Sequence, residues 1–204
     1  MKPIRFLGTA RRDLAAFPEL ARRQAGYELF MVQVGREPAD FKSLPTVGSG
    51  AYEIRIRDAA GAFRVVYVAK FEEAGLCLAR FSEEDPKDVP GGHQVGSAAL
   101  QVNRRAVMKK KQARQVKGAN NVFLDLGFPP HEAAVMLLRC ELAEALRKWM
   151  EREGISQVEA AKRLGVVQPR ISEIARNKVD KLSLDYLVGL CAKAGVSVAV
   201  KLAA

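Results

Sequence analysis

Apolar residues recur at helical spacing within residues 154–180, GISQVEAAKRLGVVQPRISEIARNKVD. The first run places Val158, Ala161 and Leu164 on one side of a predicted helix. Ser156 can cap the amino end of this helix, because its hydroxyl can accept an amide hydrogen bond from the first turn. Gly165 can adopt the left-handed conformation in which many helices end. The pattern therefore predicts a short helix between Ser156 and Gly165.

A second short helix is predicted from about Gln168, since Pro169 is tolerated only in a first helical turn. Ile171 and Ile174 give it an apolar side. Two such helices joined by a glycine-containing turn form a helix-turn-helix, which places the first turn of its second helix in the major groove of DNA. An ordinary helical hairpin within a bundle is the alternative. The polar residues that this first turn would expose are Gln168, Arg170, Ser172 and Glu173.

The N-terminal half has a different pattern. Residues 4–7 predict a short strand, and two helices follow, the second of which ends at Gly35. Residues 51–57 then alternate between apolar and charged side chains, and residues 63–71, FRVVYVAKF, predict a strong strand. The predicted class is α+β, with two helices packed on an antiparallel sheet.

The composition of the chain indicates which kinds of partner it can bind. The 204-residue chain has a formal net charge of +10, which favours a polyanion, either DNA or RNA. No run approaches the roughly 20 apolar residues of a membrane helix, and the first residues are too polar for a signal peptide. Three widely spaced cysteines and two isolated histidines suggest no metal site. We therefore expect a cytoplasmic protein with reduced thiols, no metal and no cofactor.

Residues 44–58, LPTVGSGAYEIRIRD, and residues 63–74, FRVVYVAKFEEA, resemble the HigB branch of the RelE-like mRNA interferases. The resemblance covers about residues 4–74, within a predicted toxin core of residues 1–74. It implies a ribosome-dependent toxin whose basic sheet residues hold the mRNA backbone and help to cleave it. Solvation of basic residues on an exposed sheet face is the alternative, and no catalytic residue is assigned. The candidate RNA-contacting residues are Arg55, Arg57, Arg64 and Lys70.

Residues 75–107 depart from that family, which would continue with a basic tail resembling VYVLHAFQKKTxKT. Because the middle of this segment is acidic and rich in proline and glycine, it predicts a linker rather than a strand. Permitted codons for residues 75–89, read one base later, can spell VYVLHAFQKKTPKTS. The codons of Met108 and Lys109 must also read TGA, a stop, in that shifted frame. We interpret the chain as a toxin and an antitoxin joined by a single-base slip, with an evolved linker as the alternative.

The basic stretch that follows Met108 predicts a solvated tail or an arm with phosphate contacts. A long helix is expected over about residues 131–153, with Trp149 in its core. Ser183 would cap a last helix, whose inward residues would include Val188. Residues 196–202, VSVAVKL, alternate like a short C-terminal strand, which would need a partner in a dimer or on another edge.

Three stretches of residues 108–204, NVFLDLGFPPHEA, SQVEAAKRLGVVQPRISEIARNKVDKLSLDYL and VSVAV, resemble the HigA-like antitoxins of the XRE family. The resemblance implies a homodimer that binds a palindromic operator of its own operon and neutralises a cognate toxin. Val167 is a departure, since the family commonly has a capping Ser or Thr there. By position, the phosphate anchor would be Gln157, the base readers Gln168, Arg170 and Ser172, and the backbone contacts Arg176, Asn177 and Lys178.

Three hypotheses follow. The first is a DNA-binding autorepressor of a type II toxin–antitoxin operon that carries a truncated, inactive toxin module. The second is an mRNA endoribonuclease silenced in cis by its antitoxin, with ribosome and mRNA as partners. In the third, the toxin half serves only as an oligomerisation or corepressor surface. An active toxin would need a basic tail where Glu83, Glu84 and Asp85 stand.

Overall fold

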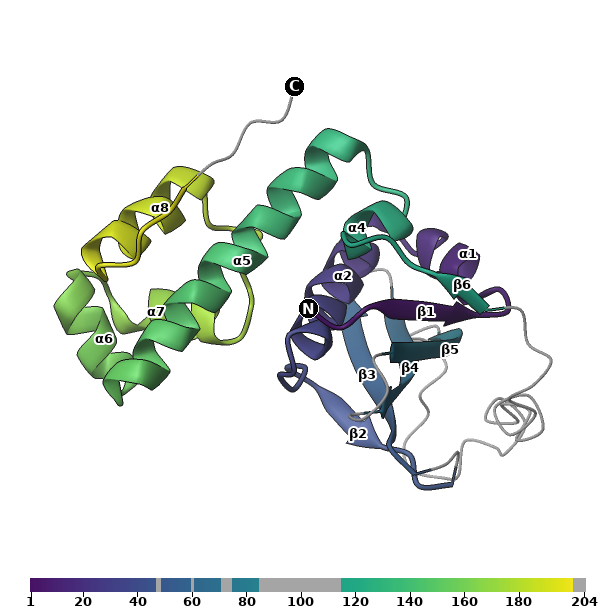
Figure 1. Cartoon of the computed structure of the whole chain (residues 1–204). Coiled ribbons are helices and arrows are strands. Elements are labelled where there is room, and N and C mark those ends of the chain that lie inside the picture. The colour runs from purple at the N-terminus through teal and green to yellow at the C-terminus, as the bar shows by residue number, and fades with distance from the viewer. Residues whose placement is uncertain (47–48, 60, 71–74, 85–114, 200–204) are drawn as a thin grey trace. The chain divides into compact units, whose positions relative to one another are not determined.

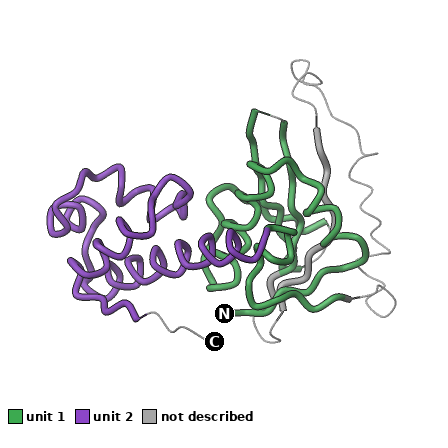
Figure 2. The backbone as a smooth tube through the Cα atoms, turned by 90° about the horizontal axis from the view of Figure 1, so that it is seen from above, with its two compact units in different colours: residues 1–128 green, residues 129–204 purple. Residues whose placement is uncertain are grey.

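The computed structural model describes residues 1–46, 49–59, 61–70, 75–84 and 115–199, with only the backbone at 69–70, 75–84 and 115. The chain divides into unit 1, Met1–Phe128, and unit 2, Pro129–Ala204 (Figure 2). This division lies after residue 128, whereas the sequence placed a domain limit before Met108. Residues 115–128 therefore fold with the N-terminal unit.

Unit 1 is built on a six-stranded sheet in the order β2-β3-β4-β5-β1-β6 (Figure 1). β1 and β5 are parallel and the other neighbours are antiparallel. The strands are β1 (Ile4–Leu7), β2 (Phe41–Ser43), β3 (Ala51–Asp58), β4 (Gly61–Lys70), β5 (Gly75–Glu84) and β6 (Gln115–Lys117). The predicted strands at 4–7, 51–57 and 63–71 are confirmed, each within a residue or two.

Helices α1 (Ala10–Ala15) and α2 (Glu19–Gln33) pack on one face of this sheet. The residues that point to this face alternate along β3 and β4, so that Ile54 and Phe63 are buried. The ring of Phe17, between the two helices, lies 4.9 Å from that of Phe63. Together with the all-helical unit 2, this arrangement confirms the predicted α+β class for the N-terminal region.

The expectation of a linker from residue 75 is wrong for its first part, because β5 is a full strand between β4 and β1. The sequence reading gave most weight to the acidic, proline-rich residues from Glu83 onward. The residues before them, GLCLARF, are apolar apart from one arginine, a composition that suits a strand with a neighbour on each side. Residues 85–107 lie outside the described residues.

Unit 2 consists of α5 (Pro130–Glu153), α6 (Gln157–Leu164), α7 (Gln168–Ala175) and α8 (Leu184–Lys193). The predicted helix caps are confirmed: Ser156 and Ser183 cap α6 and α8 by accepting backbone amide hydrogen bonds at 3.2 and 3.3 Å. Gly154 and Gly165 end α5 and α6 with φ of +63° and +67°. Trp149 is buried, as predicted.

Two predicted apolar faces are wrong in detail. Val158 is 68% exposed, and the buried residues of α6 are Ala160, Ala161 and Leu164. Val188 is 37% exposed, and Leu190 is buried in its place on α8. The other predicted positions Ala161 and Leu164 of α6 are buried, so only one edge of each apolar stripe differs from the prediction.

Residues 196–199, the described part of the predicted C-terminal strand, form no strand in this single chain. A lone strand has unsatisfied backbone groups and needs a neighbouring edge. The strand therefore stays a prediction that requires a partner, either in a dimer or on another edge. Among the described residues, no helix is long and apolar enough to cross a membrane.

Candidate nucleic-acid interface

Helices α6 and α7 form the predicted helix-turn-helix in unit 2. Ala161 and Leu164 of α6 are buried, as are Ile171 and Ile174 of α7. The turn between the helices is closed by a 2.9 Å hydrogen bond from the amide of Val166 to the carbonyl of Ala161. The apolar sides of both helices thus fix the second helix against the first and leave its polar first turn exposed.

The first residues of the two helices are joined by a side-chain hydrogen bond. Nε2 of Gln168 donates to Oε1 of Gln157 over 3.1 Å. Both side chains lie at helix amino ends, where free amides and the helix dipole favour a phosphate. Gln168 keeps its own amide oxygen available, so it can be oriented by Gln157 while it contacts a base edge.

Arg170 is exposed on the same turn of α7. Its guanidinium forms an ion pair with Glu173 at 2.9 Å, one helical turn away. Such a pair limits the rotamers of a long side chain but is weak at the surface, so DNA could replace the carboxylate. Ser172 is partly exposed on this helix.

The three residues predicted as backbone contacts have different environments. Arg176 and Lys178 are exposed, as contact with phosphate requires. Asn177 is only 1% exposed and has a φ of +54°. Asparagine tolerates this left-handed conformation better than most residues, which accounts for its presence at the end of α7. The side chain of Asn177 therefore belongs to the interior, in contrast to its predicted role.

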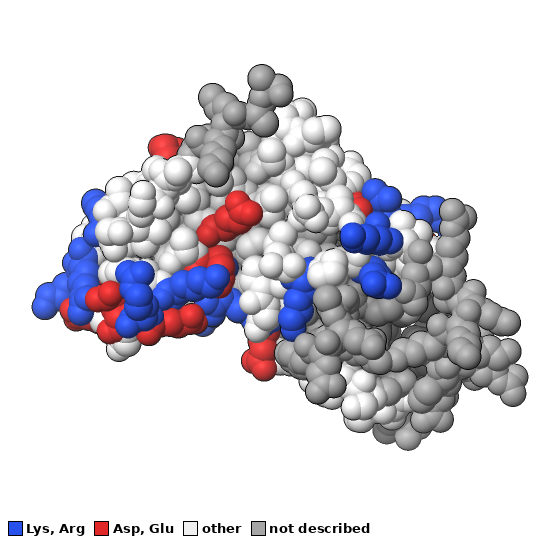
Figure 3. All heavy atoms as spheres, viewed as in Figure 1, with Lys and Arg blue, Asp and Glu red and all other residues white. Residues whose placement is uncertain are grey.

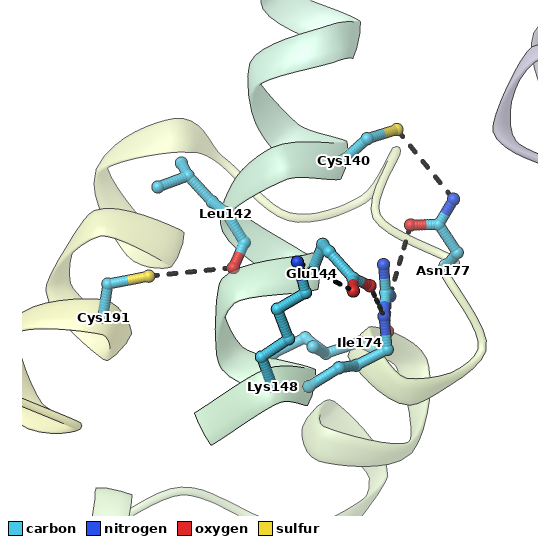
Figure 4. Close-up of polar contacts among 8 residues, drawn as sticks. Cys140, Leu142, Glu144, Lys148, Ile174, Asn177 and Cys191 are labelled. Atoms are coloured by element: carbon cyan, nitrogen blue, oxygen red, sulfur yellow. Dashed lines mark hydrogen bonds and ion pairs between the residues drawn. The ribbon is translucent and has the colours of Figure 1, made fainter. Parts of the chain in front are cut away.

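A buried polar network holds α7 against the long helix α5 (Figure 4). Nη1 of Arg147 donates to the carbonyl of Ile174 at 2.6 Å and to Oδ1 of Asn177 at 3.4 Å. Its Nε donates to the carboxylate of Glu144 at 2.9 Å. The side-chain Nδ2 of Asn177 in turn contacts the sulfur of Cys140 at 3.9 Å. This network was not predicted, because nothing in the residue pattern of a long charged helix indicates that one of its arginines is buried.

The start of α7 lacks a side-chain cap. Val167 is its N-cap residue and is 66% exposed, with no cap hydrogen bond. The departure noted in the sequence therefore persists in the structure. A missing cap costs about 1 kcal/mol, and here the packing of Ile171 and Ile174 must compensate for it.

Charges of both signs gather over the end of unit 2 that carries α6 (Figure 3). Arg163 on α6 contacts Glu159 and Glu153, each at 3.4 Å. Many of the basic groups here are thus shared with carboxylates, so the surface is not uniformly positive. Gln168 and Arg170 are exposed on the helix-turn-helix, and Gln157 is half-buried.

Three of the predicted RNA-contacting residues lie on β3 and β4, on the sheet face opposite the helices. Arg55 and Arg64 are cross-strand neighbours on β3 and β4, and each contacts the same oxygen of Glu53 at 3.1 Å. Glu53 is buried, so one carboxylate offsets part of the charge of two arginines. Arg57 is exposed, and the side chain of Lys70 lies outside the described residues.

The described residues contain no group of three or more His, Cys, Asp or Glu side chains arranged to hold a metal ion. Cys140 and Cys191 are buried free thiols. Burial raises the pKa of the Cys140 thiol to about 12 and also raises the pKa of Cys191. Since the thiolate is the reactive form, neither cysteine is suited to catalysis at neutral pH.

Comparison with protein families gives two separate matches. Residues 122–203 match a helix-turn-helix domain family. Residues 12–85 match the family of phage derived Gp49-like proteins, a toxin-related group that is RelE- and HigB-like. Comparisons with curated proteins and with solved structures returned no significant match. The chain therefore carries a Gp49-like, toxin-related region followed by a helix-turn-helix domain.

Proposed function

We propose that the chain is a sequence-specific DNA-binding regulator, the antitoxin and autorepressor of a type II toxin–antitoxin operon. The observation that carries this proposal is the hydrogen bond between Gln157 and Gln168 across the amino ends of α6 and α7. It orients a side chain that can pair with adenine beside one that can hold a phosphate. The HigA-like identity and the XRE class rest on the sequence resemblance.

The proposed DNA-binding residues are Gln157, Gln168, Arg170, Ser172, Arg176 and Lys178. Asn177 is left out because its side chain is buried. One recognition helix offers two or three base contacts worth about 1–3 kcal/mol each. Two half-sites one helical turn apart would double this energy, so the proposed functional form is a homodimer on a palindromic operator.

The test is fluorescence anisotropy of the full chain with the DNA upstream of its own gene, over a range of salt concentrations. We expect a Kd of about 10⁻⁸ M or tighter at physiological salt and binding at least about a thousandfold weaker to unrelated DNA. Equal affinity for both DNAs would contradict specific recognition.

Single substitutions separate base readers from phosphate contacts. Arg170→Ala should relax preference at one base position by about 1–3 kcal/mol, because a bidentate contact is lost there. Lys178→Ala should weaken all sequences alike and lower the salt slope by about 1. Arg12→Ala, which removes the same charge from an exposed site in unit 1, is the control and should change neither. An unchanged base preference in Arg170→Ala would refute the placement of the recognition helix.

A second candidate is ribosome-dependent mRNA cleavage by unit 1, supported by the Gp49-like match and by Arg55, Arg57 and Arg64 on one sheet face. We infer that this activity is weak or absent. The tail of the resembling toxins supplies a histidine and lysines suited to activate the 2′-hydroxyl and stabilise the scissile phosphate. This chain has Glu83, Glu84 and Asp85 there.

A cleavage assay on translating ribosomes tests that inference. We expect little cleavage by the full chain and a clear gain when residues 75–89 are replaced by VYVLHAFQKKTPKTS, the sequence of the shifted frame. The same replacement with alanine for its histidine and lysines should stay inactive. Normal turnover by the unaltered chain would overturn the inference, and the nucleotide sequence of the gene decides the frame hypothesis itself.

A further inference from the structure

Residues 115–128, here called the docking segment, join the two family matches in an unexpected way. The helix-turn-helix match begins at residue 122, yet its first helix, α4 (Val122–Asp125), folds into unit 1 together with β6, which precedes the match. The start of the helix-turn-helix family region is therefore packed on the toxin-related unit. The docking segment contacts unit 1 by strand pairing, a buried aromatic side chain and an ion pair, which are also the contacts by which separate chains bind each other.

The first contact is strand addition. β6 pairs antiparallel with β1, with Lys117 opposite Arg5 and Val116 opposite Phe6. The amide of Gly118 continues the ladder by donating to the carbonyl of Ile4 at 2.9 Å. β6 is the last strand of the sheet, so without it β1 would present an open edge.

The second contact is an aromatic anchor. Phe123 is fully buried, and its ring lies 5.3 Å from that of Tyr27 on α2. The ring occupies the space above Gly26, where any Cβ would collide with it. Leu126 is also fully buried beside this glycine. Gly26 thus provides a seat on α2 for an aromatic side chain from the docking segment.

Polar contacts fix the segment on both sides of the anchor. Asp125 forms an ion pair with Arg11 on α1 at 3.2 Å, and its other oxygen accepts from the amide of Ala119 at 2.7 Å. Burial raises the pKa of this carboxyl. The guanidinium of Arg22 stacks 4.4 Å from the ring centre of Phe128. The segment is therefore specified by a strand edge, an apolar seat and two arginines.

We propose that the docking segment is a self-contained ligand of unit 1, which unit 1 also binds when the segment is carried by a separate helix-turn-helix chain of the same sequence. The β1 edge, the Gly26 seat, Arg11 and Arg22 are its receptor. This interaction surface is independent of DNA binding, which the proposal assigns to α6 and α7. In the intact chain the covalent connection raises the local concentration of the segment.

The experiment starts from the folded full chain. A protease recognition sequence is inserted between residues 85 and 114, and the purified protein is cut there. We expect the two fragments to stay together in size-exclusion chromatography at about 10 µM, since the contacts above do not need the connection. Separation of the fragments, whether or not each stays folded, would overturn the proposal.

Matched substitutions on α4 locate the anchor in the cut protein. Phe123→Ala should weaken reassociation by about a hundredfold, because it empties a buried aromatic seat. Leu124→Ala, on the same helix but at an exposed position, should change it by less than about threefold. Equal effects of the two substitutions would contradict the proposed seat.

A peptide of residues 115–128 provides a further test, which does not depend on the folding of any variant. Added to the cut wild-type protein, it should bind and release the C-terminal fragment, whereas a scrambled peptide should not. Failure of the peptide to compete, even in large excess, would refute a self-contained ligand. DNA binding of the released fragment is measured separately, so loss of either activity is distinguished from loss of the other.

Discussion

Arg147→Ala is expected to lower the free energy of unfolding of unit 2 by about 3–5 kcal/mol, because removal of one partner leaves the other buried charge uncompensated. Arg147 is 3% exposed and Glu144 is 6% exposed. The substitution also removes a donor from the carbonyl of Ile174 and from Asn177. Since Ile174 belongs to α7, the recognition helix should lose its position as well as its stability.

Lys148→Ala is the matched control. Lys148 also contacts Glu144, at 3.8 Å, but its side chain is 70% exposed. Surface ion pairs contribute about 0–1 kcal/mol, so this substitution should have a small effect. The two variants differ mainly in burial, which makes their comparison a test of burial rather than of charge.

The single tryptophan of the chain allows unit 2 to be followed by itself. Trp149 is buried on α5, two positions from Arg147, so its fluorescence should report urea unfolding of this unit. A midpoint for Arg147→Ala within the error of Lys148→Ala would show that the network contributes nothing. Arg147→Lys should recover only part of the loss, because an ammonium lacks the planar set of donors that reaches Glu144 and α7 together.

Local signals in the sequence were sufficient for the helix-turn-helix. The caps Ser156 and Ser183, the helix ends at Gly154 and Gly165, and Pro169 in a first turn each act within a few residues. Such interactions depend on backbone groups that are close in the chain, so a pattern of residue types specifies them. Periodicity in the same way predicted β1, α1, α2, β3 and β4 of unit 1, but not β2, β5, β6 or α4.

Contacts between distant segments were not accessible from the pattern. Residues 75–84 form a strand because β1 and β4 each offer an edge, although the sequence there runs into an acidic stretch. Asn177 was predicted to contact the DNA backbone because it follows α7. Its side chain is instead buried, where it accepts a hydrogen bond from Arg147, thirty residues earlier on α5. The same holds for Glu53, whose burial between Arg55 and Arg64 modifies the basic face that the strands predicted.

Residues 115–128 show the same limit for domain boundaries. The basic stretch after Met108 and the segment NVFLDLGF were assigned with the helix-turn-helix, because they adjoin it and resemble its family. In the structure, Phe123 and Asp125 make their contacts with Tyr27, Gly26 and Arg11. A family boundary and a packing boundary need not coincide when one segment serves as a ligand for the neighbouring unit.

Gly26→Leu is expected to destabilise unit 1 by about 3 kcal/mol or more, since four added carbon atoms would occupy the space of the Phe123 ring. Gly189→Leu is its control, because Gly189 also lies within a helix but has open space around it. Leucine is a better helix former than glycine by about 0.5–1 kcal/mol, so the control should be neutral or slightly stabilising. Both substitutions have the same helix propensity gain and differ in what the new side chain meets.

Hydrogen–deuterium exchange measured by mass spectrometry separates the two units in one experiment. For Gly26→Leu, faster exchange is expected in peptides from β1, β6 and α4, with unit 2 unchanged. If exchange rose in α2 alone while β6 stayed protected, the strand contact would hold the docking segment without the aromatic seat. If α2 and β6 both stayed protected, a small shift of Phe123 would have relieved the collision at Gly26. The space above Gly26 would then not determine how residues 115–128 bind unit 1.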